Sequence, residues 1–418
     1  MKGGGQVGSY NGVVGTFTGS TGTATVTGAG STWTTGSLCV GEEGAGTLNI
    51  EAGGQVSNSY GYLGYLSGST GTATVTGVGS TWTTGNLYVG VLGAGTLNIE
   101  AGGQVSNLGS YLGYYSGSTG TATVDGIGSV WNNTVSLYVG GSDSVAGGTG
   151  SVTVRNGGQL LVGGIVKLWK ADSAVTVNDG TVTAGAVEGE TGTIRITDPA
   201  GGTALTVGSA GAGTFSGALL DDTGPGSLTK IGAGTQVLAG GGIMYTGTTT
   251  VLEGTLKLSD TTAFASDILN GATTEFEVTA GTWTFDEAIG GAGRFVKSGA
   301  GTLVIAGPQD YDVGAILEVL AGTVDLNTDA SGTGLIDDAD LSILVTGAVL
   351  NFGCNQHLDT LEIGDGGLVR FTGANVVVLK HLVMDGVDLG ATTLTPEPAT
   401  LGLLALGGLA LLRRRRAA

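Results

Sequence analysis

The chain has 418 residues, of which 85 are glycine and only 5 are proline, and it carries a formal net charge of −19. Collagen would need a strict three-residue glycine period with abundant proline, and a hydrophobic content of 40% argues against intrinsic disorder. The acidic charge disfavours binding to nucleic acid. The only two cysteines, Cys39 and Cys354, are too few for a disulfide framework, and we expect both to be unpaired.

The first third of the chain repeats with a period of 49 residues. Trp33, Trp82 and Trp131 occupy the same place in successive copies, and each copy divides into two similar halves. Within a half, short stretches such as TATV and TLNI alternate with period 2 between glycine-containing turns. A fixed period of this size is typical of a solenoid, because stacked coils bury an apolar face that one coil cannot bury alone.

We therefore predict an all-β parallel β-helix with three short strands in each coil of about 24 residues. Alternating residues such as Leu48 and Ile50 are expected to face the interior, and Thr47 and Asn49 to face solvent. A β-sandwich is the alternative fold, because period-2 strands separated by turns every ~8–12 residues also suggest it.

Four regions follow one another along the chain. The regular repeats occupy 1–144 and more degenerate coils occupy 145–223, whereas a second type of repeat appears at 224–260 and again at 291–326, within a region that extends from 224 to 394. Residues 395–418 form the last region. The chain begins inside a repeat without the charged and apolar segments of a signal peptide, so we expect an upstream coding segment that supplies one.

The last region has three parts: a Pro-Glu-Pro motif, an uncharged stretch over 399–412, and a run of arginines. Fourteen residues span ~21 Å as a helix, which predicts a short hydrophobic helix whose basic end stays in the cytoplasm. A buried C-terminal helix is the alternative. The candidate sorting residues are Pro396, Glu397, Pro398, Arg413, Arg414, Arg415 and Arg416.

Three stretches carry a resemblance to known families. The 49-residue phrase resembles the repeat shared by type V autotransporter-like and PEP-CTERM proteins, and the second repeat, GSLTKIGAGTQVLAG with its continuation, is similar to the autotransporter-associated β-strand repeat. The tripartite ending resembles the PEP-CTERM sorting signal, which is also described as an ice-binding protein C-terminal domain.

This resemblance implies export in a Gram-negative-type bacterium and transient inner-membrane anchoring through residues 399–412. It further implies processing near the Pro-Glu-Pro motif by an exosortase-type enzyme and a destination at the cell surface or in the extracellular matrix. It implies no enzymatic activity and no cofactor.

Few residues have the chemistry of a catalytic site. The two histidines, His357 and His381, lie in strand-like segments. Glu51, Glu100 and Asp125 recur because the repeat recurs, so a solvated ladder explains them better than a pair of catalytic carboxylates. We predict no catalytic residues.

Residues 329–340 follow the spacing of an EF-hand loop, with Asp329 first, Gly334 at the sharp turn and Asp340 last. The following residues alternate like a strand instead of continuing as a helix. An acidic turn between strands therefore competes with a calcium loop, and no metal ligand is assigned.

We predict an exported structural or adhesive surface protein that offers repeated polar ladders to weak multivalent partners, including extracellular polysaccharide. A carbohydrate-binding or polysaccharide-degrading β-helix enzyme is the main alternative. An ice-binding protein is a minor one, suggested by outward threonines that Asn49 and Asn98 interrupt. A strip of tyrosines has two interpretations, sugar stacking or a stacked solenoid wall, of which we favour the second. It comprises Tyr60, Tyr62, Tyr65, Tyr111 and Tyr114.

Overall fold

The computed structural model describes residues 2–199, 202–208 and 211–396. Apart from one short 3-10 helix, η1 (Ile336–Asp338), the regular elements of this part are β-strands. The chain divides into two compact units: unit 1 comprises Met1–Gln236 and Gly242–Gly247, and unit 2 comprises Val237–Gly241 and Thr248–Ala418.

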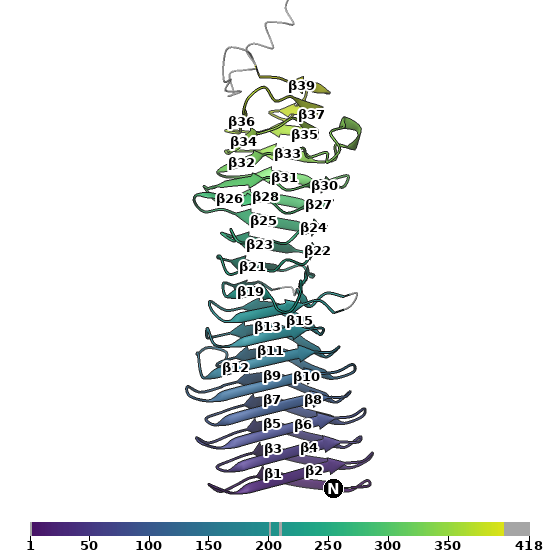
Figure 1. The fold of residues 1–418 in the computed structure, drawn as a ribbon, viewed down its shortest axis with the longest axis vertical. Coiled ribbons are helices and arrows are strands. Elements are labelled where there is room, and N and C mark those ends of the chain that lie inside the picture. Colours follow the sequence, from purple (N-terminus) through teal and green to yellow (C-terminus); the bar gives the residue numbers. More distant parts are fainter. Residues whose placement is uncertain (1, 200–201, 209–210, 397–418) are drawn as a thin grey trace, which may run out of the picture. The chain divides into compact units, whose positions relative to one another are not determined.

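Unit 1 is a parallel β-solenoid with two sheets, in which each strand pairs with the strand of the coil before it. Figure 1 shows these strands stacked one above another. Sheet I contains β1 (Gln6–Val14), β3 (Thr32–Val40), β5 (Gln55–Leu63), β7 (Thr81–Val89), β9 (Gln104–Leu112), β11 (Val130–Val139), β13 (Gln159–Leu168), β15 (Thr181–Glu188), β17 (Leu205–Val207) and β20 (Leu228–Lys230). Sheet II contains β2 (Thr21–Thr27), β4 (Ala45–Glu51), β6 (Thr70–Thr76), β8 (Ala94–Glu100), β10 (Thr119–Asp125), β12 (Thr149–Arg155), β14 (Ala174–Asn178), β16 (Thr193–Thr197) and β19 (Ala218–Asp221).

Unit 2 is also a parallel β-solenoid, but its coils contribute to three sheets. The first contains β22 (Thr249–Val251), β24 (Ile268–Asn270), β27 (Ile289–Gly291) and β30 (Gln309–Tyr311). The second contains β23 (Thr255–Ser259), β25 (Thr273–Glu277), β28 (Arg294–Ser298), β31 (Ile316–Val319), β33 (Ser342–Val345), β35 (Gln356–Ile363) and β37 (Val377–Met384). The third contains β26 (Thr282–Phe285), β29 (Thr302–Ile305), β32 (Thr323–Leu326), β34 (Val349–Phe352) and β36 (Leu368–Phe371).

The remaining strands lie at the margins of the units. β18 (Gly213–Phe215) belongs to unit 1, and β21 (Thr235–Ala239) begins in unit 1 and ends in unit 2. At the C-terminal end of unit 2, β38 (Val387–Asp388) and β39 (Thr392–Leu394) pair with β37 in antiparallel fashion. These two short strands cover the edge that β37 would otherwise leave open to pairing.

The predicted parallel β-helix is confirmed in both units, and parallel pairing rules out the β-sandwich. The prediction of three strands per coil was wrong for unit 1, where the second and third expected strands join into one continuous strand. In β3 the register with β1 is interrupted at Gly36, whose added Cβ would stand 2.7 Å from the Tyr10 carbonyl oxygen. In β7 the register with β5 is interrupted at Gly85, whose added Cβ would stand 2.4 Å from the Ser59 carbonyl oxygen, so glycine permits the close approach.

A buried hydrogen bond explains why unit 1 repeats every two coils. Trp82 and Trp131 are fully buried, and each indole N–H needs an acceptor. Asn58 Oδ1 accepts from Trp82 Nε1 at 2.7 Å, and Asn107 Oδ1 accepts from Trp131 Nε1 at 2.9 Å. Each asparagine lies in the coil preceding its tryptophan, so tryptophan and asparagine coils alternate in these copies, whereas in the first copy Trp33 Nε1 donates to Ser9 Oγ at 3.4 Å.

The sequence predicts four regions that differ in the regularity of their repeats: 1–144, 145–223, 224–394 and 395–418. This division of the chain stays a prediction. The hydrophobic helix expected over 399–412 lies outside the described residues. Within the residues that the structure describes, no helix has the length and apolar character needed to cross a membrane.

Candidate functional site

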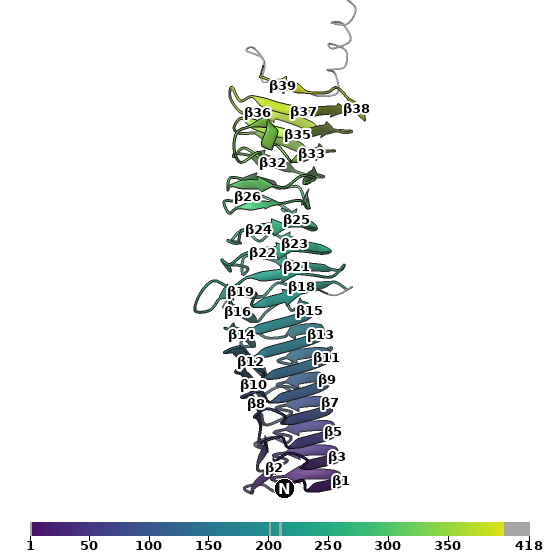
Figure 2. The same cartoon turned by 90° about the vertical axis from the view of Figure 1, so that its right-hand side faces the viewer.

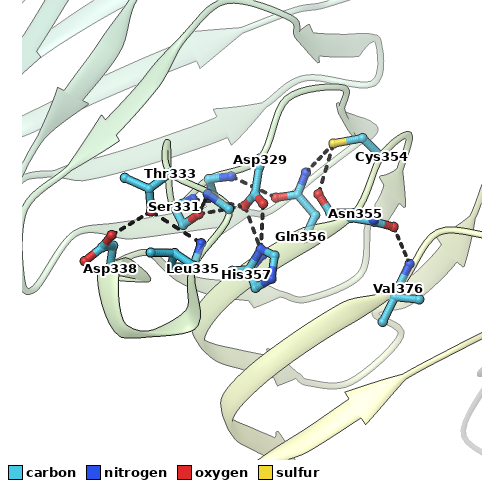
Figure 3. A network of polar contacts seen from close by, with 12 residues as sticks. Asp329, Ser331, Thr333, Leu335, Asp338, Cys354, Asn355, Gln356, His357 and Val376 are labelled. Atoms are coloured by element: carbon cyan, nitrogen blue, oxygen red, sulfur yellow. Dashed lines mark hydrogen bonds and ion pairs between the residues drawn. The ribbon is translucent and has the colours of Figure 1, made fainter.

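A network around Asp329 joins a loop of unit 2 to strand β35 (Figure 3). One carboxylate oxygen, Oδ2, lies 2.6 Å from Nδ1 of His357, and the other, Oδ1, accepts the His357 backbone N–H at 3.0 Å. The same Oδ1 also accepts the backbone N–H of Ser331 at 3.1 Å. Asp329 thus orients the imidazole and fixes the start of the loop at once.

Gln356, the neighbour of His357, forms hydrogen bonds to the same loop from inside the solenoid. Its side chain is fully buried; Oε1 accepts the Ala330 N–H at 3.0 Å and Nε2 donates to the Thr328 carbonyl oxygen at 2.6 Å. A buried amide with both ends satisfied is a strong positioning element. The loop after β32 is therefore held by two adjacent residues of β35.

The calcium interpretation of residues 329–340 does not fit this geometry. The carboxylate at the first ligand position is engaged by His357 and Ser331, and the Thr333 hydroxyl at the fifth position donates to Asp338 Oδ2 at 2.6 Å. Strand β33, and not a helix, follows the loop. Among the described residues, no group of three or more His, Cys, Asp or Glu side chains could hold a metal ion.

Cys354 lies near this network but is not an activated nucleophile. Its Sγ donates to the Asn355 carbonyl oxygen at 3.1 Å and accepts from Gln356 Nε2 at 3.1 Å. Burial, and then the negative charge of Asp329, raise the pKa of the thiol, so the reactive thiolate is disfavoured. Both cysteines are free, as predicted, and burial followed by Glu42 raises the pKa of Cys39 to about 12.

The other candidate catalytic groups are dispersed. His381 pairs with Asp388 at 2.9 Å on an exposed part of β37, away from the Asp329 network in sequence. Glu100 and Asp125 are register partners on the outside of sheet II. A hydrogen bond from Asn156, together with Arg155, holds the pKa of Asp125 below its usual range. This is the solvated ladder expected from the repeat.

The tyrosines of sheet I form a stacked column. Tyr62, Tyr88, Tyr111 and Tyr138 lie on successive coils, with ring centroids 5.2, 4.8 and 5.2 Å apart and interplanar angles of 10–20°. Tyr114 packs edge-on against two of them. Because the rings cover one another, their faces are not open to a sugar, which supports the interpretation as a solenoid wall.

Burial raises the pKa of several tyrosines in this column. The pKa of Tyr88 rises to about 12, mainly through burial and then through the neighbouring phenols Tyr111 and Tyr114. The pKa values of Tyr62, Tyr111 and Tyr114 rise for the same leading reason. These four phenols are therefore uncharged at neutral pH.

A buried lysine in unit 2 was missed by the sequence analysis. Lys297 is fully buried, and its ammonium group donates to the carbonyl oxygens of Ser298 (2.7 Å), Gly299 (2.8 Å) and Ala321 (3.2 Å). Burial lowers its pKa to about 8. Lys230, also buried, donates in the same way to Ile231 and Gly232. The sequence contained a signal for these buried lysines, because both occupy the same position of the second repeat, in LTKIGAGT and FVKSGAGT.

The predicted sorting residues fall mainly outside the described part of the chain. Pro396 is its last residue and follows β39 without regular structure. Glu397, Pro398 and the four arginines, Arg413 to Arg416, lie beyond it. Their assignment depends on sequence comparison.

Comparison with known proteins covers two parts of the chain. Residues 228–258 and 295–312 match the passenger-associated transport repeat, and each stretch contains one of the buried lysines. Residues 394–416 match the PEP-CTERM protein-sorting motif. No curated protein and no solved structure gives a significant match. The chain is thus a β-solenoid protein with passenger-associated transport repeats and a C-terminal PEP-CTERM sorting motif.

Proposed function

We propose that the protein is a structural or adhesive component of the cell surface or extracellular matrix. The observation that carries this proposal is the PEP-CTERM motif at 394–416, which indicates surface sorting of an exported protein and processing by an exosortase. The solenoids ahead of the motif suit this role, because stacked coils repeat the same outward side chains many times and so favour multivalent contacts.

The proposal includes no catalytic step. It is supported by the dispersal of the titratable groups: His357 is paired with Asp329, His381 with Asp388, and the Cys354 thiol has a raised pKa. A glycoside hydrolase would need two carboxyl groups facing one sugar. In the proposed role Asp329 and His357 position a loop.

The test determines the cellular location of the protein and the position of its mature C-terminus. We would express it behind a working signal peptide in a host with an exosortase, fractionate the cells and determine the C-terminus by mass spectrometry. We expect cleavage near Pro398 and the solenoid at the surface or in the medium. The matched control is Glu397→Ala, which alters only the motif. An intact chain retained in the cytoplasm would contradict the proposal.

A second experiment separates a scaffold from an enzyme. Residues 70–118 comprise one 49-residue copy, and their removal places Thr119 where Thr70 stood, with the same register partners. A scaffold should keep its fold, secretion and surface attachment after this deletion. Loss of surface attachment, with fold and secretion intact, would point to a single localised site.

A further inference from the structure

Sheet II of unit 1 presents two columns of uncharged side chains to solvent, next to a third column that holds Glu51, Glu100 and Asp125. Its strands pair in register, so outward side chains form columns that run from coil to coil. One column holds threonine and asparagine in alternation up to β10: Thr25, Asn49, Thr74, Asn98, Thr123 and Thr153. The neighbouring column, from Thr23 to Ser151, holds threonine in five coils and serine in the sixth. We call these two columns the hydroxyl face. The strands that carry it, such as β8, β10 and β12, are labelled on the left side of the stack in Figure 2.

Three polar side chains of the hydroxyl face are available to a ligand. Thr74, Asn98 and Thr123 are partly exposed. Within the part of the chain that the structure describes, their side chains have no protein hydrogen-bond partner, whereas Asp125 in the next column is paired with Arg155. In a chain with a net charge of −19, neither of these two columns carries a charged side chain from β2 to β12.

The spacing of the hydroxyl face is fixed by the solenoid. Neighbouring coils are ~4.8 Å apart, and alternate residues along one strand are ~6.6 Å apart. Because threonine and asparagine alternate, the pattern repeats every two coils, or ~9.6 Å. The buried Trp–Asn bonds impose the same two-coil period from inside. A rigid ligand that repeats at this interval would meet equivalent groups at every step.

We propose that the hydroxyl face binds an extended, neutral β-linked glycan that runs along the stacking direction. Such a glycan is uncharged, rich in hydroxyl groups and repeats every two sugars, because successive rings are flipped. The asparagine amides and threonine hydroxyls would pair with sugar hydroxyls directly or through water. This inference rests on the proposed surface function, since it names its partner class.

Affinity on this face should depend on the length of the glycan. A single hydrogen bond exchanged with water contributes little, so one disaccharide should bind weakly. Each further disaccharide engages another pair of coils at a high effective concentration. The stacked tyrosine column of sheet I offers no comparable site, because its ring faces are covered.

The test uses the purified full chain, so it is independent of sorting. Cello-oligosaccharides of two, four and six sugars and microcrystalline cellulose are the probes. We expect affinity to rise at least tenfold from the shortest to the longest oligosaccharide, and the protein to be retained on cellulose. The variant Thr74→Val/Thr123→Val keeps the β-branched shape and removes two hydroxyls that are two coils apart. It should reduce retention at least threefold while the circular dichroism spectrum stays unchanged.

The matched control is Thr34→Val/Thr83→Val, which removes two exposed hydroxyls of sheet I at the same separation. It should bind like the unmodified protein. Equal retention of the two variants, absence of retention on cellulose, or an affinity independent of length would overturn the inference. Shaping of ice crystals without cellulose binding would also overturn it, in favour of ordered water as the ligand. Failure of sorting in cells would leave these results unaffected.

Discussion

Both units stack parallel coils, but they differ in the spacing of like positions and in the arrangement of strands. In the regular part of unit 1, from β2 to β10, like positions of sheet II lie 24 or 25 residues apart, as from Thr21 to Ala45 and from Ala45 to Thr70, and each coil has two strands. In unit 2 the spacing varies more from coil to coil: it is 20 residues from Ile289 to Gln309 and 18 from Thr255 to Thr273, and the coils contribute to three sheets. The regular coil contains one long strand, such as β3, where the coils of unit 2 have separate short strands.

The side chains differ accordingly. Unit 1 builds its tyrosine column and many of its outer ladders from uncharged side chains, which gain from stacking without repulsion. Unit 2 repeats less regularly and places opposite charges side by side. Lys257 lies 3.1 Å from Glu275 and 2.8 Å from Glu277, and Arg294 pairs with Glu318. Opposite charges on neighbouring coils thus occur where the repeat is less regular, including Arg155 and Asp125 in unit 1.

The units also differ in how they satisfy polar groups in the core, and the largest expected effect lies there. Lys297→Met removes the buried donor shared by three carbonyl oxygens of unit 2, so we expect a loss of about 3 kcal/mol in unfolding free energy. Urea denaturation measures it. Lys170→Met, at a partly exposed lysine of unit 1, is the control and should change stability by less than about 0.5 kcal/mol. Equal effects would show that the carbonyl contacts are unimportant.

In unit 1 the corresponding change is Asn107→Ala. It leaves the buried indole N–H of Trp131 without its acceptor and removes the bond from Asn107 Nδ2 to Asn133 Oδ1, so we expect a loss of about 2 kcal/mol. Asn98→Ala, on the outer face, should cost less than about 0.5 kcal/mol. Urea denaturation followed by tryptophan fluorescence compares the two. A cost at Asn98 as large as at Asn107 would refute the explanation of the two-coil period.

A change of pH should affect the stability of unit 2 less than Lys297→Met does, because a neutral amine at Lys297 still donates two hydrogen bonds. The folded-state pKa of Lys297, about 8, lies below its ordinary value of 10.5. Between these values the unfolded chain binds more protons, so the stability of unit 2 should rise with pH over this window and be complete above it. Unfolding free energies measured across the window should show the rise, and Lys297→Met should abolish it. A fall in the unmodified protein would contradict the prediction.

The stability of unit 1 should change with pH in the opposite direction and fall at alkaline pH. The pKa of Tyr88 is raised from 10.0 to about 12, so the folded state retains a proton that the unfolded chain loses. The contribution of the column is complete below pH 10 and is lost as pH rises towards 12. Ultraviolet absorbance of the phenolate should show a late-titrating fraction of tyrosines. Tyr88→Phe should reduce that fraction.

The sequence was sufficient for much of the architecture. The 49-residue period and the period-2 alternation predicted the parallel solenoid, and residues such as Leu48 and Ile50 are fully buried as expected. The tripartite ending predicted the sorting motif that comparison supports. These features are local or periodic, so neighbours in space can be inferred from spacing along the chain.

Other features depend on contacts that spacing alone does not specify. The close approach of Gly36 to Tyr10, the hydrogen bond from Lys297 to the Ala321 carbonyl oxygen and the pairing of Asp329 with His357 each bring together groups of adjacent coils. Asp329 illustrates the difference: its spacing resembled a calcium loop, and its carboxylate is instead engaged by a histidine 28 residues away. Periodicity determines which residues face inward or outward, and only the tertiary structure decides which donor meets which acceptor, because a hydrogen bond depends on distances and angles that a repeat does not encode.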